Sequence, residues 1–192
     1  MRLLVVNGSP RPKGSTGLLC DTLIAGSKES GAKAVYACLG EKKLCFCRGC
    51  RECSRTGKCP QPDDMPELLN EIVLCDALVL ASPSYWRDVT AQMKTFIDRC
   101  LPLCEHTNPG AMTTGRKGYS VAIRAGMDKN ESLRLIDTFD HFFGHLKIKP
   151  SGMLTFEGVS SPNDLTQDHL REAFRFGKYI GTQDNGTRGK TC

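Results

Sequence analysis

Residues 2–17 decide the fold, and they read RLLVVNGSPRPKGSTG. Residues 3–6 are a short apolar run that an Asn-Gly pair ends, which is typical of a parallel strand buried on both faces. A loop rich in glycine, proline and serine follows, and apolar residues then recur four positions apart from Leu19 onward. The stretch therefore predicts a strand, a loop and a helix, the first half of a βαβ unit.

The same alternation of strand and helix continues along the chain. Four further apolar runs predict strands at residues 34–39, 77–81, 119–123 and 151–156. Apolar residues at helical spacing predict the helices between and after these strands. One such segment is capped by Asp64, one lies around Met93, and two more cover residues 133–146 and 165–180. Five consecutive βα units predict an α/β fold in which a parallel sheet carries helices on both faces.

The composition indicates one soluble domain. The chain has 192 residues, 40% of them hydrophobic and 24% charged, and its net charge is +5. This charge permits anionic small-molecule ligands but is too small and scattered to indicate nucleic-acid binding. No apolar run approaches the roughly 20 residues of a membrane helix, and the N-terminus lacks signal-peptide features, so we expect a cytoplasmic protein without membrane contact. We expect a domain over residues 1–181 and a polar, disordered tail over residues 182–192.

Three loops that follow predicted strands are candidate ligand sites, because ligands bind parallel sheets beyond the carboxyl ends of the strands. The first offers hydroxyl groups and positive charge beside the backbone N–H groups of a helix start, which favours one phosphate monoester. Its candidate phosphate ligands are Ser9, Arg11, Ser15 and Thr16. The loop lacks the residue order of a Walker loop and the G-x-G-x-x-G of a dinucleotide turn. An ordinary βα turn with surface charges is the alternative.

The second and third loops suit a flat ring. The second holds Tyr85 beside Trp86, the only tryptophan, and such side chains at a ligand-binding edge suit a planar heterocycle. Packing of these two rings over the core is the alternative. The third loop begins with Arg124, Ala125 and Gly126, where small residues let a ligand approach the backbone closely.

The chain has 11 cysteines, and five of them fall between residues 45 and 59. An odd count without an export signal argues against a disulfide framework, so the cluster indicates metal or redox chemistry. From Cys47 the spacing is C-x₂-C-x₂-C-x₅-C, and three closely spaced thiolates favour an iron–sulfur cluster over zinc, whose sites usually hold two more distant pairs. Zinc and unmetallated thiols are the alternatives, and Cys45 is an extra thiol that could replace a ligand.

Together the three loops resemble the flavodoxin-like NADPH-dependent FMN reductase family. The matching motifs are GSPRPKGST after the first strand, SPSYW after the third and the TAQMKTFIDR helix, and the likeness extends to about Ile180. The resemblance implies a doubly wound five-stranded sheet of order 2-1-3-4-5 that binds FMN noncovalently, in a homodimer or homotetramer with flavin near the subunit interface. It implies phosphate contacts by Ser9, Arg11, Ser15 and Thr16, ribityl and isoalloxazine contacts by Pro83, Ser84, Tyr85 and Trp86, and Arg124, Ala125 and Gly126 on the flavin's other side.

The cysteine-rich loop after the second strand, residues 45–63, resembles that of the iron–sulfur flavoproteins of anaerobic microbes. Those proteins carry one [4Fe–4S] cluster and one FMN per subunit. The resemblance implies that the cluster ligands are Cys47, Cys50, Cys53 and Cys59. Cys20, Cys75 and Cys100 fall on or beside apolar helical stripes, so we expect them in the core.

The sequence thus predicts an FMN-dependent oxidoreductase that takes electrons from NAD(P)H or a ferredoxin-like carrier and passes them to an unidentified acceptor. No side chain need act as acid or base, so no catalytic residue is assigned. A non-catalytic electron carrier and a metal-stapled binding module are the alternatives. The net charge disfavours the carrier, because flavodoxins are usually acidic. The family resemblance implies a role in structure or assembly for Lys94, Asp98 and Arg99, but we interpret their charges as a solvated helix face.

Overall fold

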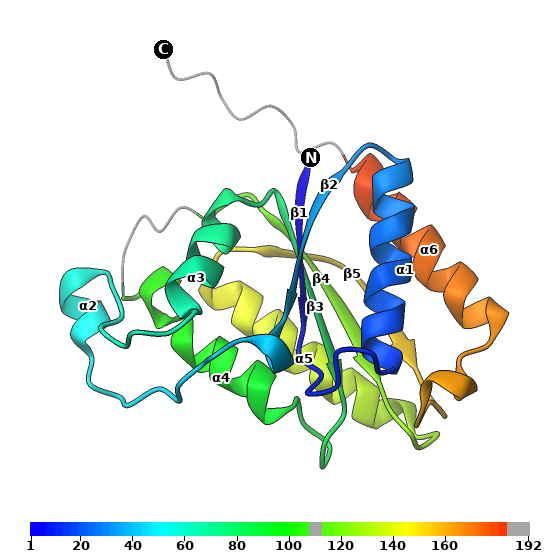
Figure 1. The fold of residues 1–192 in the computed structure, drawn as a ribbon. Helices are drawn as coiled ribbons and strands as arrows, with labels where there is room; N and C mark the ends of the chain where they lie inside the picture. Colours follow the sequence, from blue (N-terminus) through cyan, green and yellow to red (C-terminus); the bar gives the residue numbers. More distant parts are fainter. Residues whose placement is uncertain (108–112, 184–192) are drawn as a thin grey trace.

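The five strands form one parallel sheet in the order β2-β1-β3-β4-β5 (Figure 1). The computed structural model describes residues 1–107 and 113–183. The strands are β1 (Arg2–Asn7), β2 (Lys33–Cys38), β3 (Ala77–Pro83), β4 (Lys117–Ile123) and β5 (Lys149–Phe156). Because β1 pairs with both β2 and β3, the strand order reverses between β1 and β3. The ligand crevice of an open parallel sheet is expected at such a switch point.

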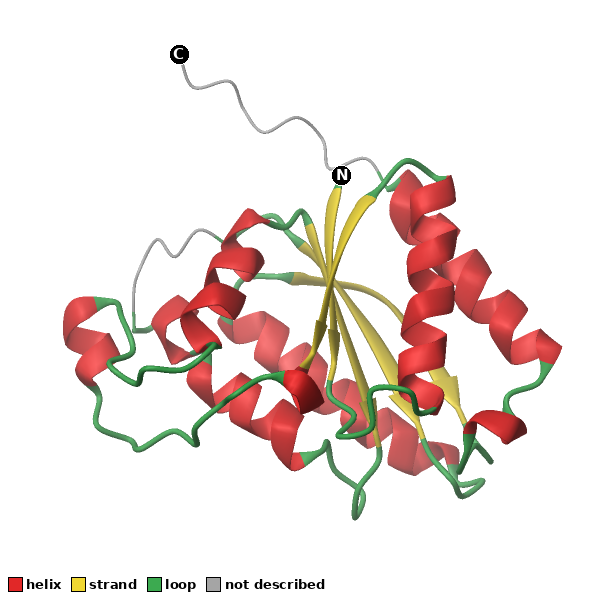
Figure 2. Ribbon diagram, viewed as in Figure 1, coloured by secondary structure: helices red, strands yellow, loops and turns green. Residues whose placement is uncertain are grey.

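Helices cover both faces of the sheet (Figure 2). One face carries α1 (Ser15–Glu29) and α6 (Gln167–Thr182), and the other carries α3 (Met65–Leu74), α4 (Ala91–Arg99) and α5 (Lys129–His145). Alternate residues of β1 pack into the two hydrophobic cores, one on each face of the sheet. Leu3 and Val5 pack towards α1 and α6, and Leu4 and Val6 pack towards the other helices. The predicted flavodoxin-like doubly wound α/β fold is confirmed.

Two local details differ from the sequence prediction. The cysteine segment contains a short helix, α2 (Glu52–Thr56), because five residues are too few for a helical period to show in the sequence. Asp64 occupies the N-cap position of α3, but its side chain makes no capping bond within the described part of the chain. The Asp64 carboxylate accepts a hydrogen bond from the Lys43 N–H (2.7 Å), and Asp63 bonds the Met65 N–H (3.1 Å) in its place.

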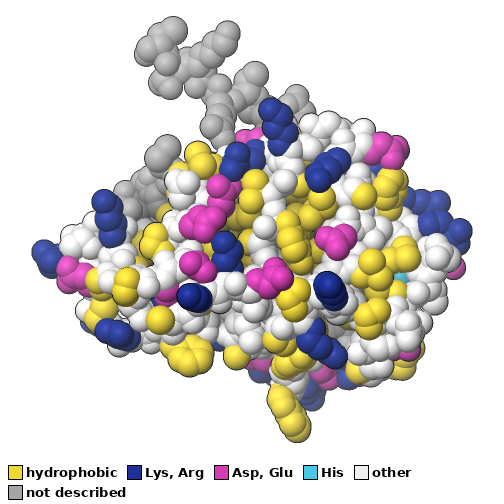
Figure 3. Space-filling model, in the orientation of Figure 1, with side chains coloured by type: hydrophobic (Ala, Val, Ile, Leu, Met, Phe, Trp, Pro, Cys, Tyr) yellow, Lys and Arg dark blue, Asp and Glu magenta, His cyan; other side chains and the backbone are white. Residues whose placement is uncertain are grey.

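The remaining segments are short. Single 3₁₀ turns are η1 (Leu39–Glu41), η2 (Leu101–Leu103) and η3 (Pro162–Asp164). Residues 184–192 of the tail that we predicted to be disordered lie outside the described residues. Among the described helices, none has both the length and the apolar character needed to cross a membrane. On the face drawn in Figure 3, basic and acidic side chains lie among the hydrophobic ones.

Candidate functional site

The three candidate loops meet at one edge of the sheet, beyond the carboxyl ends of β1, β3 and β4. The loop after β1 is tied to β3 by a hydrogen bond from the Gly8 N–H to the Ala81 carbonyl oxygen (2.8 Å). Thr90, which caps α4 at the end of the loop after β3, donates its hydroxyl to the Gly8 carbonyl oxygen (2.5 Å). The Ser84 N–H bonds the Ile123 carbonyl oxygen (2.7 Å), which ties the same loop to β4. The three loops therefore form one connected edge.

The first loop presents the N-terminus of α1. Ser15 and Thr16 occupy the first turn, which contains no acidic residue, and among the residues that the structure describes no side chain caps the helix. Unpaired N–H groups and the helix dipole favour an anion at this position. Ser9 is buried and its Oγ accepts a hydrogen bond from the Arg11 N–H (3.1 Å), so Ser9 orders the loop. Arg11 itself is exposed.

The second loop holds its aromatic residues away from the core. Pro83 ends β3, and two backbone hydrogen bonds between Tyr85 and Asp88 (2.8 and 3.1 Å) then close a tight turn. Trp86 and Arg87 form its tip with φ angles of 55° and 63°, which is the left-handed region that such side chains rarely adopt. The Trp86 side chain is fully exposed and that of Tyr85 is partly so. Packing of the indole over the core is thus excluded.

The third loop is joined to the second by Glu131, which the sequence analysis missed. Arg124, Ala125 and Gly126 follow β4 directly. Glu131, in the first turn of α5, accepts a hydrogen bond from the Ser84 hydroxyl (Oγ–Oε1, 2.5 Å) and pairs through Oε2 with Arg124 Nη2 (3.0 Å). Gly126 leaves room for this arginine, because a Cβ there would lie 2.2 Å from Nη2. In the sequence, a glutamate at a helix start indicates only local capping.

The four cysteines predicted as ligands share one segment but differ in exposure. Cys47 and Cys50 are exposed, Cys53 is buried in α2, and Cys59 is intermediate. Burial raises the pKa of the Cys53 thiol, and the neighbouring Cys59, Cys47 and Cys50 raise it further. Within residues 1–107 and 113–183, no three or more His, Cys, Asp or Glu side chains are gathered into a metal-holding group.

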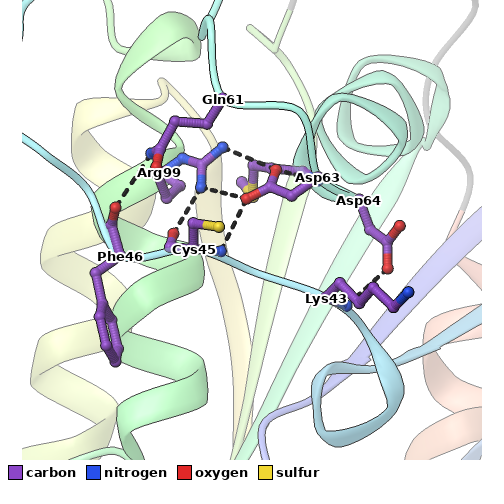
Figure 4. Close-up of polar contacts among 8 residues, drawn as sticks. Lys43, Cys45, Phe46, Gln61, Asp63, Asp64 and Arg99 are labelled. Carbon is purple, nitrogen blue, oxygen red and sulfur yellow. Dashed lines mark hydrogen bonds and ion pairs between the residues drawn. The ribbon is translucent and has the colours of Figure 1, made fainter.

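Arg99 anchors this segment, so the interpretation of all three α4 charges as solvated is wrong for one of them. Lys94 and Asp98 do form an exposed ion pair (2.5 Å). The side chains of Arg99 and Asp63 are only 1% and 2% exposed and form an ion pair (2.7 Å) that also holds the backbone of Cys45 (Figure 4). Burial alone would raise the pKa of Asp63, but the Arg99 guanidinium and two backbone N–H groups lower it to about 2.

Three cysteines outside this segment lie where the sequence predicts. Cys20, Cys75 and Cys100 are buried in the two cores. Burial raises the pKa of the Cys75 thiol to about 12 and raises those of Cys20 and Cys100 as well. These thiols therefore stay protonated, and protonated thiols are poor metal ligands.

Comparison with known proteins decides the family. The family model described as NADPH-dependent FMN reductase matches residues 1–136. The chain belongs to the NADPH-dependent FMN reductase family. Within it, an iron–sulfur flavoprotein of Archaeoglobus fulgidus is 33% identical over 180 residues, which cover 94% of this chain and 79% of the relative. An iron–sulfur flavoprotein of Methanocaldococcus jannaschii is 32% identical over 188 residues, covering 94% and 95% respectively.

A solved structure agrees with this assignment at the level of the fold. An FMN-dependent NADH-azoreductase from Bacillus anthracis, in complex with FMN, matches 94% of this chain and 100% of its own, with a TM-score of 0.73 at 14% identity. Membership of the NADPH-dependent FMN reductase family confirms the prediction of an FMN-dependent oxidoreductase. The roles of individual residues in the three loops and in the cysteine segment stay predictions.

Proposed function

We propose that the chain binds FMN at the edge where the three loops meet and transfers electrons from NAD(P)H, or from a ferredoxin-like donor, to a separate acceptor. One observation carries the proposal: the uncapped N-terminus of α1 opens at the switch point between β1 and β3. A phosphate group there would receive backbone N–H donors, the Ser15 and Thr16 hydroxyls and the charge of Arg11. The buried Ser9 would keep the loop in place.

The other two loops would flank the flavin ring system. The segment from Pro83 to Trp86 would contact the ribityl chain and one isoalloxazine edge, while Arg124, Ala125 and Gly126 would lie on the other side. Glu131 supports this arrangement because it bonds one residue of each loop. Bound FMN would supply the hydride and single-electron chemistry that amino-acid side chains lack. The protein's own task is to bind and orient, so we assign no acid or base.

We also propose that Cys47, Cys50, Cys53 and Cys59 hold a [4Fe–4S] cluster. The compact spacing of the four cysteines in the sequence and two relatives named iron–sulfur flavoproteins support the proposal. Such a cluster, when bound, would supply one-electron transfer. The alternatives to the cluster are a zinc ion bound by the same thiols and thiols that bind no metal.

The fully exposed Trp86 supports the proposal of a homodimer or homotetramer, because a large aromatic held out in a strained turn is a surface that a second copy can cover. We further propose a single domain over residues 1–181 and a cytoplasmic location. Sedimentation of wild type and of Trp86→Ala tests the assembly. A wild-type monomer would contradict it.

The visible spectrum and NAD(P)H oxidation of the purified protein test the proposed function together. Flavin absorption with steady oxidation of NADPH or NADH in the presence of an artificial acceptor is the expected result. If reduced ferredoxin reduces the flavin and NAD(P)H does not, the electron donor is a ferredoxin-like protein. Flavin that no donor turns over would favour the non-catalytic carrier. A colourless protein with stoichiometric zinc would favour the metal-stapled module and contradict the proposal.

A further inference from the structure

The cysteine segment, residues 45–63, is closed at its base by a charged pair whose arginine belongs to α4 (Figure 4). The Arg99 guanidinium meets Asp63 at two points, Nη1–Oδ2 (2.7 Å) and Nη2–Oδ1 (2.9 Å). Nη1 also donates to the Cys45 carbonyl oxygen (2.6 Å), and the Cys45 N–H donates to Asp63 Oδ2 (2.8 Å). One ion pair thus fixes both backbone polar groups of Cys45.

A second contact lies one step further into the segment. The Gln61 side chain is buried, and its Nε2 donates to the Phe46 carbonyl oxygen (3.1 Å). The four proposed ligands all lie between Phe46 and Gln61 in the sequence, inside the closed part of the segment. Cys45 lies at the base itself, where its backbone already serves the ion pair.

A role in stability alone does not require charged side chains at this position. A buried ion pair often contributes no more stability than apolar side chains of the same size would, because both charges lose their hydration. The pair does fix the two ends of the cysteine segment, Cys45 and Asp63, which are 18 residues apart in the sequence.

We propose that Arg99 is a positioning residue for the thiol site: it closes the base of the cysteine segment before any metal arrives. The proposal rests on the proposed function, in which these thiols hold a metal cluster. A loop whose ends are already fixed loses less conformational freedom when it closes around a metal. The same helix connects this base to the flavin edge, because Thr90 caps α4 and bonds Gly8.

Co²⁺ titration of the reduced, metal-free protein tests the proposal, since cobalt–thiolate complexes absorb visible light. The variant is Arg99→Met combined with Asp63→Asn, which removes the guanidinium, leaves no unpaired buried charge and keeps an acceptor for the backbone N–H of Cys45. The matched control is Lys94→Gln combined with Asp98→Asn, which removes the exposed ion pair of the same helix. Circular dichroism and FMN binding establish that each variant is folded.

We expect the Arg99 variant to bind Co²⁺ about tenfold or more weakly than wild type, and the control to bind as wild type does. In the metal-free protein, amide hydrogen exchange in residues 46–61 should be faster in the Arg99 variant alone. A folded Arg99 variant with unchanged Co²⁺ affinity and unchanged exchange would overturn the proposal.

The hydrogen-exchange comparison separates this proposal from the proposed function. If wild type binds neither Co²⁺ nor iron, the cluster assignment fails, whereas the exchange result still decides whether Arg99 closes the segment. If wild type binds metal and only the Arg99 effect is missing, the cluster assignment stands and the positioning role fails.

Discussion

Replacing Ser15 with alanine and Thr16 with valine removes two hydroxyls from the first turn of α1. Neither hydroxyl makes a hydrogen bond within residues 1–107 and 113–183, so the free energy of unfolding should change little. Each hydroxyl that donates to a charged phosphate contributes about 1.5–3 kcal/mol. Losing both should weaken FMN binding by about 3–6 kcal/mol, which is about two to four powers of ten in Kd.

Fluorescence titration with FMN and with riboflavin measures this effect, because riboflavin lacks the phosphate. The double variant should bind riboflavin nearly as wild type does. Thr22→Val is the matched control, since Thr22 lies on the same helix and its hydroxyl donates to the Leu18 carbonyl oxygen (2.7 Å). Equal losses for FMN and riboflavin would refute the placement of the phosphate at α1, and so would no loss for either.

Three further predictions concern other residues. Glu131→Gln removes the charge that pairs with Arg124 and weakens the hydrogen bond from the Ser84 hydroxyl, so we expect FMN binding about tenfold weaker by fluorescence titration. Unchanged FMN binding would show that the link between these two loops plays no part. Asp63 has a folded pKa of about 2 against a usual 3.8, so it contributes about 2 kcal/mol above pH 4, and this contribution is lost as the pH falls towards 2. Urea denaturation across that range should show the loss in wild type, and a curve matching that of Asp63→Asn would contradict it. Cys45→Ala should leave the iron content of anaerobically prepared protein intact while Cys47→Ala lowers it, and the reverse pattern would contradict the ligand assignment.

The sheet, its helices and the meeting of the three loops could be predicted because each depends on local pattern. Apolar runs and helical stripes mark the elements, and strand ends in a parallel sheet must lie at one edge. The core positions of Cys20 and Cys100 followed from the same stripes. These predictions needed no knowledge of which distant side chains meet.

The polar contacts that connect distant segments could not be predicted. Ser84 and Glu131 are 47 residues apart, and Asp63 and Arg99 are 36 apart, so no local spacing pairs them. Arg99 follows two charged residues on α4 that do face solvent, and only the packed structure separates it from them. The strained turn at Trp86 was also invisible, because its tip lacks the glycine or asparagine that usually marks a left-handed turn.

We propose that one chain holds both FMN and an iron–sulfur cluster. Anaerobic purification, followed by analysis of flavin, iron, acid-labile sulfide and zinc in the same sample, measures both cofactors at once. We expect about one FMN, four irons and four sulfides per chain, with little zinc. FMN with stoichiometric zinc and no iron would contradict the cluster, and a chain without flavin that cannot take up added FMN would contradict both parts of the proposal.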